Sequence, residues 1–474
     1  MNSSSMKLSR RLAIALCLTS LAIPLAHAVD TAEPVKKPKY IFLFIGDGMS
    51  TPQRMVAEEF ARVTGYGELA MNTLPYQANT RTKSANSIIT DSAAAATAIA
   101  SGEKTNNGML GILPDGTPVV SVAEIAKKRG MKVGIASTVT VVHATPAGFY
   151  AHRKNRGEVY AIALDLVASG FDYFCAGGVY DEENDVKNPA YEGNVYDLAR
   201  KAGYRVVRDD LAAWRALRPG AKVWSVFGDC GMDFAIDANP NQPSPAEIVR
   251  KGIELLDNPE GFFFMFEGGR VDYAGHANDA GSNLRDVLAL DEAVKVALMF
   301  LDQHPDETLV ITTGDHETGG MSMGFAGIGG RFKVQLLAGQ KVSIEKFSDE
   351  VKRLLKKREG KVSFEEMKPV LVEKFGLSEL TEAEEKSLSK AFAQDVENVR
   401  NRLKDTTAHD VARRYAFAQT VKMVLNARAG IGWSSGSHTA LPTFTTAKGV
   451  GAEILLGMTE NTDLGRRMKG LLEK

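Results

Sequence analysis

The sequence has few cysteines and no excess of charge of either sign, and both absences exclude classes of protein. Three cysteines occur among 474 residues and none lies in a Cys-x-x-Cys pair, which excludes a disulfide scaffold and a cysteine-rich zinc fold. Lysine and arginine number 57 against 58 aspartates and glutamates, so there is no basic surplus to hold a polyanion. We therefore expect neither nucleic acid nor an anionic membrane surface as a partner.

Long apolar runs are also scarce, and the one near the N-terminus has the features of an export signal. Three basic residues precede an apolar stretch over residues 12–25, and Ala26-His27-Ala28 supplies small residues at both positions of a cleavage site. A membrane anchor needs about 18 or more apolar residues, which this run does not reach. We expect residues 1–28 to be a signal peptide, the mature chain to be periplasmic or extracellular, and no segment to span a membrane.

Two cysteines remain after such a cleavage, in a compartment where disulfides persist. Cys175 and Cys230 either form one bridge or remain as two free, buried thiols, because sequence gives no distance between them. Both alternatives stay open at this stage.

Short β-branched and aromatic runs alternate with longer stretches of helical period. Strands alternating with helices predict an α/β fold with a mostly parallel central sheet and helices on both faces. The expected strands are residues 40–45, 131–137, 171–175, 222–227, 261–266 and 308–313, and the expected helices include residues 92–101, 119–129, 245–256 and 283–301.

One region breaks this alternation. Residues 342–427 are rich in lysine and glutamate and nearly free of strand signals, and Ser363 with Glu366 is typical of a capping box. We interpret the region as a helical insertion in one catalytic domain over residues 35–474. An independent partner-binding domain is the less favoured alternative, because chemically suggestive residues lie on both sides of the region.

Carboxylates, imidazoles and hydroxyls follow the expected strands. In an open parallel sheet, ligands bind outside the carboxyl ends of the strands, so these side chains should meet. Mixed nitrogen and oxygen ligands suit zinc, whereas carboxylate and hydroxyl oxygens suit magnesium, and the set is too large for one ion. The residues are Asp47, His143, Thr145, Glu267, Asp272, His276, Asp315, His316 and, beyond the helical region, His438.

Ser92 is the candidate nucleophile. It stands at the start of an alanine-rich stretch that favours a helix, where free backbone N–H groups and the helix dipole attract a phosphate. The alternative is that Ser92 or Asp91 only caps the helix, and local sequence alone favours that alternative.

The motifs, taken together, resemble the alkaline phosphatase family. GDGM, TDSAAAATA, EGGRVDYAGH, TTGDHETGG and SGSH occur in this order between Lys39 and Gly457. The resemblance implies an alkaline phosphatase-like fold and a secreted enzyme that hydrolyses small-molecule phosphate monoesters at alkaline pH. It also implies a phosphoserine intermediate, two zinc ions, one magnesium ion and the release of inorganic phosphate.

The resemblance implies a role for each matching residue. Ser92 matches the nucleophile, Arg156 the phosphate clamp and Asp91 the residue that orients the clamp. The implied metal ligands are Asp47, Asp315 and His316 for the first zinc ion, Asp272, His276 and His438 for the second, and Asp47, Thr145 and Glu267 for magnesium.

Two positions depart from the best-known bacterial pattern, which has aspartate at His143 and lysine at Tyr273. We expect an altered third metal site, a different magnesium dependence and weaker retention of phosphate. A phosphodiesterase or phosphonate hydrolase is a less favoured alternative, because Arg156 suits two free oxygens of a monoester. A sulfatase is less favoured still, and a binding protein without catalysis would lack a site residue. Whether the protein is a homodimer is left open.

Overall fold

The computed structural model describes residues 37–179, 191–328, 330–404 and 415–473. The expected signal peptide, residues 1–28, lies outside the described residues. Among the described residues, no helix combines the length and the apolar character needed to cross a membrane.

Ten strands form one central sheet, in the order β14-β2-β13-β8-β1-β7-β3-β4-β6-β5. Neighbouring strands are parallel except for β13, which is antiparallel to both β2 and β8. The strands are β1 Tyr40–Gly46, β2 Tyr76–Arg81, β3 Lys132–Thr140, β4 Tyr173–Gly177, β5 Tyr204–Arg208, β6 Lys222–Val226, β7 Phe262–Gly268, β8 Thr308–Gly314, β13 Thr443–Gly449 and β14 Gly457–Glu460. Four short strands lie outside it: β9 Glu317–Thr318, β10 Met321–Met323, β11 Ile431–Trp433 and β12 His438–Thr439.

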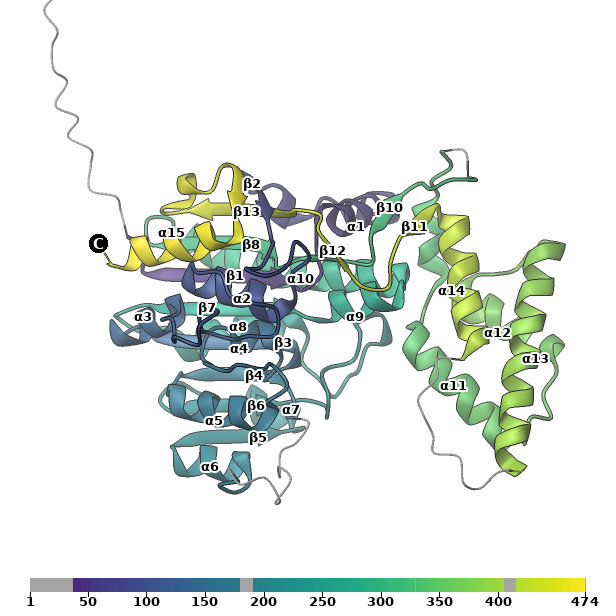
Figure 1. Cartoon of the computed structure of the whole chain (residues 1–474), viewed down its shortest axis with the longest axis horizontal. Coiled ribbons are helices and arrows are strands. Elements are labelled where there is room, and N and C mark those ends of the chain that lie inside the picture. Colours follow the sequence, from purple (N-terminus) through teal and green to yellow (C-terminus); the bar gives the residue numbers. More distant parts are fainter. Residues whose placement is uncertain (1–36, 180–190, 329, 405–414, 474) are drawn as a thin grey trace, which may run out of the picture. The chain divides into compact units, whose positions relative to one another are not determined.

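Helices cover both faces of the sheet, which confirms the predicted fold class (Figure 1). The six predicted strands are β1, β3, β4, β6, β7 and β8, each displaced by at most a few residues. The helices outside residues 342–427 are α1 Thr51–Thr64, α2 Ser92–Ser101, α3 Val122–Lys128, α4 Ala144–Ala147, α5 Val159–Ser169, α6 Val195–Lys201, α7 Leu211–Arg215, α8 Pro245–Leu256, α9 Arg270–Ala277, α10 Ala280–Gln303 and α15 Asn461–Glu473.

Strand β1 shows how the sequence builds two cores. Successive side chains of a strand point to opposite faces, and every residue of β1 is buried. Phe42 and Phe44 pack in a cluster shared with α1, α8 and α10. Ile41, Leu43 and Ile45 pack in a second cluster shared with α2, α3, α5 and α15. Burial on both faces holds the carboxyl end of β1 rigidly in place.

Four helices occupy the region that was expected to be a helical insertion, and we call them the helical segment. They are α11 Ile344–Lys357, α12 Phe364–Phe375, α13 Glu382–Lys404 and α14 Ala416–Ala429. Ser363 and Glu366 form the predicted capping box at the start of α12. Apolar side chains of the segment belong to the same buried cluster as one face of the sheet. That the segment is an insertion in one catalytic domain stays a prediction.

The two cysteines of the described chain are both free thiols. Cys175 is buried in β4, as one alternative expected, whereas Cys230 is exposed. The expectation of two buried thiols is therefore wrong for Cys230, which lies in a surface turn after β6.

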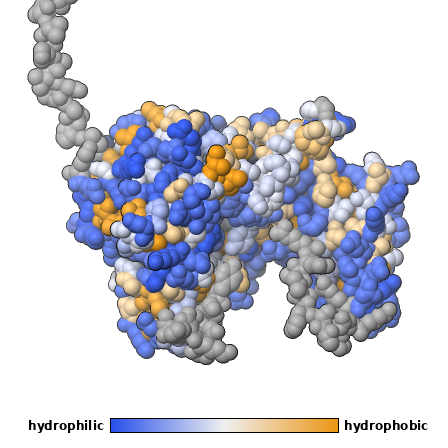
Figure 2. All heavy atoms as spheres, in the orientation of Figure 1, coloured by the Kyte–Doolittle hydropathy of each residue, from blue (hydrophilic) through white to orange (hydrophobic). Residues whose placement is uncertain are grey.

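On the face of the molecule that Figure 2 shows, apolar residues occur only in small groups among mostly hydrophilic side chains.

Candidate active site

Three neighbouring strands, β8, β1 and β7, end at the same edge of the sheet, and the candidate site lies there. Gly46 at the end of β1 pairs with Gly268 of β7 and Gly314 of β8, so the three strands end at the same level. Asp47 and Asp315 follow directly after β1 and β8. The carboxylates that follow these strands therefore meet because the strands pair in parallel with no register shift.

The structure gathers the predicted ligands into three groups. Within each group, one nitrogen or oxygen atom from every member lies within 4.8 Å of the others. The groups are Asp47 with Asp315 and His316, Asp272 with His276 and His438, and Asp47 with His143 and Glu267. Asp47 belongs to two of them, and His316 stacks on His438 of the remaining group with ring centroids 3.6 Å apart, so the three groups form one site. Thr145, the remaining expected ligand, is buried beside Asp47, and its Oγ1 donates a hydrogen bond to Asp47 Oδ2 at 3.3 Å.

The first group leaves carboxylate oxygens without partners in the protein. Asp47 Oδ1 and Asp315 Oδ2 are fully buried and accept no hydrogen bond. They lie 3.4 and 3.2 Å from Nε2 of His316. Buried polar atoms are almost always satisfied, so orphaned oxygens that converge with an imidazole nitrogen point to an absent cation. The donor set fits zinc.

Crowding of these carboxylates changes their acidity. Burial, followed by repulsion from Asp315 and Asp272, raises the pKa of Asp47 well above its usual range. Burial and the charges of Asp272 and Glu267 likewise raise the pKa of Asp315 to about 8, although the Gly48 N–H donates to its Oδ1 at 3.0 Å. Without a bound cation, burial and mutual repulsion therefore keep Asp47 and Asp315 protonated at pH values at which they would ionise in water.

Hydrogen bonds fix which nitrogen of each histidine in the second group faces inward. His276 Nδ1 lies 2.8 Å from the Gly436 carbonyl, and His438 Nδ1 lies 3.0 Å from the Thr90 carbonyl. A carbonyl only accepts, so each neutral ring donates from Nδ1 and leaves Nε2 without a proton. The two Nε2 atoms then face each other at 3.2 Å beside Asp272, an arrangement that a shared metal ion would stabilise.

His316 is oriented in the same way by Thr318. The Thr318 hydroxyl donates to Asp272 Oδ1 and lies 3.2 Å from His316 Nδ1. Since its proton is engaged with the carboxylate, the hydroxyl accepts from Nδ1–H, and Nε2 again points inward. Burial, followed by repulsion from Arg156 and from neighbouring histidines whenever these are protonated, lowers the pKa of His316 well below its usual range, so the ring stays neutral.

The candidate nucleophile lies next to His316. Ser92 is the first residue of α2, is 2% exposed, and its Oγ is 3.2 Å from His316 Nε2. Capping of α2 is performed by Asp91, whose Oδ1 accepts from the Ala94 N–H at 3.0 Å. The alternative in which Ser92 is itself the cap is therefore wrong, and its hydroxyl is available for chemistry.

Asp91 also positions Arg156. Its second oxygen, Oδ2, accepts from Nη1 of Arg156 at 3.1 Å and from the Gly108 N–H at 3.0 Å. Arg156 Nη1 also lies 3.5 Å from Ser92 Oγ. The guanidinium thus lies beside the Ser92 hydroxyl and is held by Asp91, the residue that caps α2.

His143 differs from the other three histidines. Its Nε2 lies 3.2 Å from Arg156 Nη2, which can only donate, and its Nδ1 lies 3.0 Å from Glu267 Oε1. The ring therefore accepts from Arg156 and donates to Glu267, and it offers no free lone pair to a metal in this arrangement. Tyr273 borders His143, with ring centroids 6.2 Å apart.

Glu267 stays ionised in spite of complete burial. Burial acts to raise the pKa of Glu267, but attraction to the adjacent His143 ring, its hydrogen bond and the hydrogen bond from the Ser137 hydroxyl outweigh burial, and the pKa is lowered. An ionised Glu267 beside the Asp47 and Thr145 oxygens provides the all-oxygen surroundings that magnesium prefers.

Sequence reasoning did not identify Ser137, Glu317 or Thr318. Glu317 accepts hydrogen bonds from Gln53, Thr439 and two backbone N–H groups, so it ties β9 to β12, which carries His438. Glu317 and Thr318 lie inside the TTGDHETGG motif and were therefore within reach. Ser137 gave no local signal, because its partner Glu267 is 130 residues away.

Comparisons with known proteins agree with this geometry. The family model described as alkaline phosphatase matches residues 38–474. The chain is 30% identical over 441 residues to alkaline phosphatase 4 of Bacillus subtilis, covering 89% of this chain and 86% of that protein. Among solved structures, the Thermus thermophilus alkaline phosphatase is 30% identical with a TM-score of 0.76, covering 92% of both chains. A cold-active enzyme from Shewanella sp. is 25% identical with a TM-score of 0.77, covering 92% of this chain and all of that chain. The chain therefore belongs to the alkaline phosphatase family.

Proposed function

We propose that the protein hydrolyses phosphate monoesters in two steps, with Ser92 carrying the phosphoryl group between them. The observation that supports this most is the position of Ser92 Oγ, 3.2 Å from His316 Nε2 and 3.5 Å from Arg156 Nη1, beside buried oxygens that have no partner. The candidate nucleophile Ser92, the Arg156 guanidinium and the predicted cation site therefore lie next to one another.

The ligand groups suggest which ions the site takes. Asp47, Asp315 and His316 would hold one zinc ion, and Asp272, His276 and His438 a second. Asp47, Thr145 and Glu267 would hold magnesium, with His143 acting on Glu267 from outside the ligand set. When bound, the two zinc ions would favour the serine alkoxide and stabilise charge on the entering and leaving oxygens.

The protein's own groups bind and orient the substrate. The guanidinium fork of Arg156 matches two non-bridging phosphoryl oxygens, and Asp91 holds it in register with Ser92. The first backbone N–H groups of α2 lie at the positive end of the helix dipole, where they attract the same anion. This surrounding favours a monoester dianion over a diester, which has one free charge fewer.

The two displacements restore the enzyme. In the first, the bond from Ser92 Oγ to phosphorus forms, the ester bond breaks, and the serine proton leaves with the alcohol. In the second, water attacks phosphorus, the bond to Ser92 breaks, the serine recovers a proton, and inorganic phosphate departs.

His143 and Tyr273 set the expected behaviour of the third site. Because His143 donates to Glu267 and accepts from Arg156, a bound magnesium ion would be held by fewer protein atoms than with a carboxylate at this position. Tyr273 adds no positive charge next to the bound phosphate, whereas a lysine at this position would. Activity should therefore respond to added magnesium, and product phosphate should leave readily.

Export and self-association complete the proposal. We propose that residues 1–28 direct the chain to the periplasm or the medium, where zinc and phosphate esters are available. Mass spectrometry of the secreted protein would show an N-terminus near residue 29 if this is correct. Self-association stays a prediction, and light scattering after size exclusion would decide it.

The direct test is hydrolysis of p-nitrophenyl phosphate at about pH 7 to 10, with zinc and magnesium added or omitted. Ser92→Ala should abolish turnover, whereas Ser101→Ala, at the other end of α2, should leave turnover intact. Hydrolysis of bis-p-nitrophenyl phosphate alone would favour a diesterase. No turnover in the metal-loaded wild type would favour a binding protein.

A further inference from the structure

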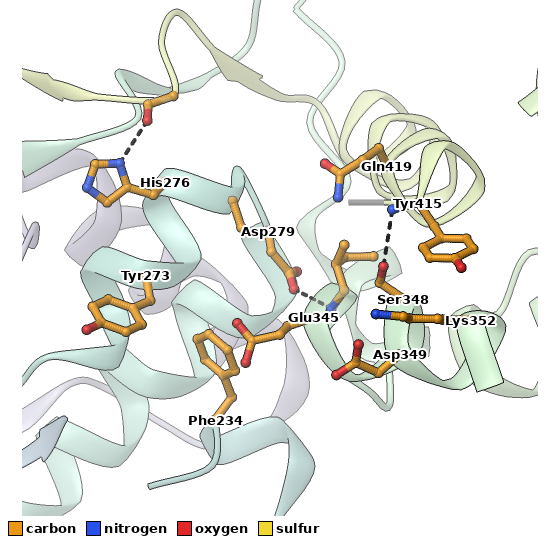
Figure 3. Close-up of a pocket in the computed structure, with 13 residues that line it drawn as sticks. Phe234, Tyr273, His276, Asp279, Glu345, Ser348, Asp349, Lys352, Tyr415 and Gln419 are labelled. Atoms are coloured by element: carbon orange, nitrogen blue, oxygen red, sulfur yellow. Dashed lines mark hydrogen bonds between the residues drawn. The ribbon is translucent and has the colours of Figure 1, made fainter. Parts of the chain in front are cut away.

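A pocket of about 740 Å³ lies between α9 and the helical segment (Figure 3). One wall comes from α9 and the loop before α10, and the opposite wall comes from α11 and the start of α14. The lining residues include Phe234, Tyr273, His276, Ile344, Glu345 and Asp349. A space of this size accommodates an organic group of drug-like dimensions.

The pocket adjoins the candidate site through His276. This residue lines the pocket and belongs to the ligand group of Asp272 and His438. Ser92 adjoins the other zinc group, through His316. In an in-line displacement the leaving oxygen lies opposite the nucleophile, so the alcohol of the substrate would emerge on the His276 side. The pocket is the space next to that exit.

The two walls are joined by buried contacts, so the pocket is part of the folded structure. Asp279, before α10, accepts from the Ile344 N–H of α11 at 2.9 Å. Lys422 of α14 donates to the carbonyl of Ala277 at 2.6 Å. Ile344 is itself buried. These bonds fix α11 and α14 against the end of α9 and preform the cavity.

The lining combines apolar side chains with carboxylates of α11. Phe234 and Ile344 are apolar members of the lining, and Glu345 and Asp349 are its acidic members on α11 (Figure 3). Glu345 and Asp349 are exposed acids one helical turn apart, and they outnumber the one ammonium group of the lining, Lys352. A flat apolar body with a positively charged end therefore fits this cavity best.

We propose that this pocket binds the alcohol portion of the substrate and selects aromatic or similarly flat alcohols that carry an amine. The inference rests on the proposed function and deepens it, because it assigns substrate preference to Glu345 and Asp349 of the helical segment. The phosphoryl group is bound by other residues, so the pocket changes which ester is preferred and leaves the chemical step unchanged.

The experiment compares three monoesters with the metal-loaded enzyme. Phenyl phosphate has no tail, 4-(2-aminoethyl)phenyl phosphate has a cationic tail, and 4-(2-carboxyethyl)phenyl phosphate has an anionic tail of similar size. We expect kcat/KM for the cationic ester to exceed that for the anionic ester by about tenfold, the effect of two exposed charge pairs. The double variant Glu345→Gln, Asp349→Asn should reduce this ratio to about threefold or less and leave phenyl phosphate hydrolysis unchanged.

A matched control removes an exposed carboxylate elsewhere in the helical segment. The Glu365 side chain of α12 is 73% exposed and does not line the pocket, so Glu365→Gln should leave all three rates unchanged. Phenyl phosphate turnover with a ratio that the double variant does not move would overturn the pocket assignment alone. A wild type that hydrolyses none of the three esters would overturn the proposed function as well.

Discussion

The candidate site and the helical segment place their charges in opposite ways. At the site, Asp47 and Asp315 are fully buried beside one another, each with an oxygen that has no partner. In the helical segment, Glu384 forms an ion pair with Arg428 at 2.6 Å near the surface, and Lys368 lies between Glu365 and Glu385. Asp47 and Asp315 lie beside the His316 imidazole, whereas these carboxylates of the helical segment pair with arginine or lysine.

The difference separates groups that are held for a ligand from groups that stabilise the fold. Burying like charges together costs stability, and a folded protein retains such an arrangement only where binding or catalysis uses it. Exposed ion pairs contribute little individually, and their removal does not touch the chemistry. Substitutions in the two regions should therefore have opposite effects on stability and on activity.

The largest effect is expected from Asp47→Asn. Activity should fall by more than about 100-fold, because loss of even an outer-shell partner of a metal costs about 10- to 100-fold. In the metal-free protein the same change should raise the melting temperature, since it removes one of the repelling carboxylates. Turnover assays test the expected loss of activity, and thermal unfolding in the presence of a chelator tests the expected rise in melting temperature. A metal-free variant less stable than the wild type would contradict the comparison.

Arg156→Lys should lower kcat/KM for phosphate monoesters by about 10- to 100-fold, because an ammonium cannot bind two phosphoryl oxygens as a fork does. The change keeps the positive charge, so thermal stability should hardly move. Arg153→Lys is a useful contrast, since that arginine pairs with Asp165 outside the ligand groups. Equal losses in the two variants would contradict a specific role for the Arg156 fork, because Arg153 lies outside the ligand groups.

The metal-free protein should lose stability as pH rises from about 4 to about 8. The folded pKa of Asp315 is about 8, above its ordinary value of 3.8. Between pH 3.8 and about pH 8, Asp315 is ionised in the unfolded chain but keeps its proton in the folded chain. Rising pH therefore lowers the free energy of the unfolded state relative to that of the folded state. The loss should be on the order of 2 kcal/mol or more. Denaturant unfolding at several pH values measures it, and an equal loss with zinc bound would contradict the account.

The smallest effect is expected in the helical segment. Arg428 lowers the pKa of Glu384 to about 2, so this pair stabilises the fold above about pH 4.5 and its contribution is lost as pH falls towards 2. A double-mutant cycle with Glu384→Gln and Arg428→Gln should give a coupling free energy of about 0.5 kcal/mol at neutral pH. Turnover of p-nitrophenyl phosphate should stay unchanged, and a drop would show that the segment takes part in the chemistry.

Much of the architecture could be predicted because local signals and burial coincide. The alanine run predicted α2 over residues 92–101 with both ends correct, and the helix predicted over residues 245–256 is α8 with the same bounds. Strands β2 and β13 were missed, because their sequences are largely polar and their threonine side chains pair with threonines of neighbouring strands. Such pairing depends on neighbours that are distant in sequence.

The candidate site was predictable in its membership but not in its hydrogen bonding. Strand-end position and family motifs brought together every residue now found in the three ligand groups. Which ring nitrogen of His143 faces Arg156, and that Thr318 orients His316, depend on distances between segments far apart in the chain. These contacts set the surroundings of Glu267 and His316, and only the folded geometry contains them.

The most direct test of the central claim is to trap the phosphorylated enzyme. Metal-loaded protein is mixed with a phosphate monoester, quenched in acid within one turnover, digested and analysed by peptide mass spectrometry. The account predicts a phosphoryl group on Ser92, in the peptide that contains TDSAAAATA, and none in Ser92→Ala. Turnover without any phosphorylated residue, or with phosphate on a different residue, would contradict it.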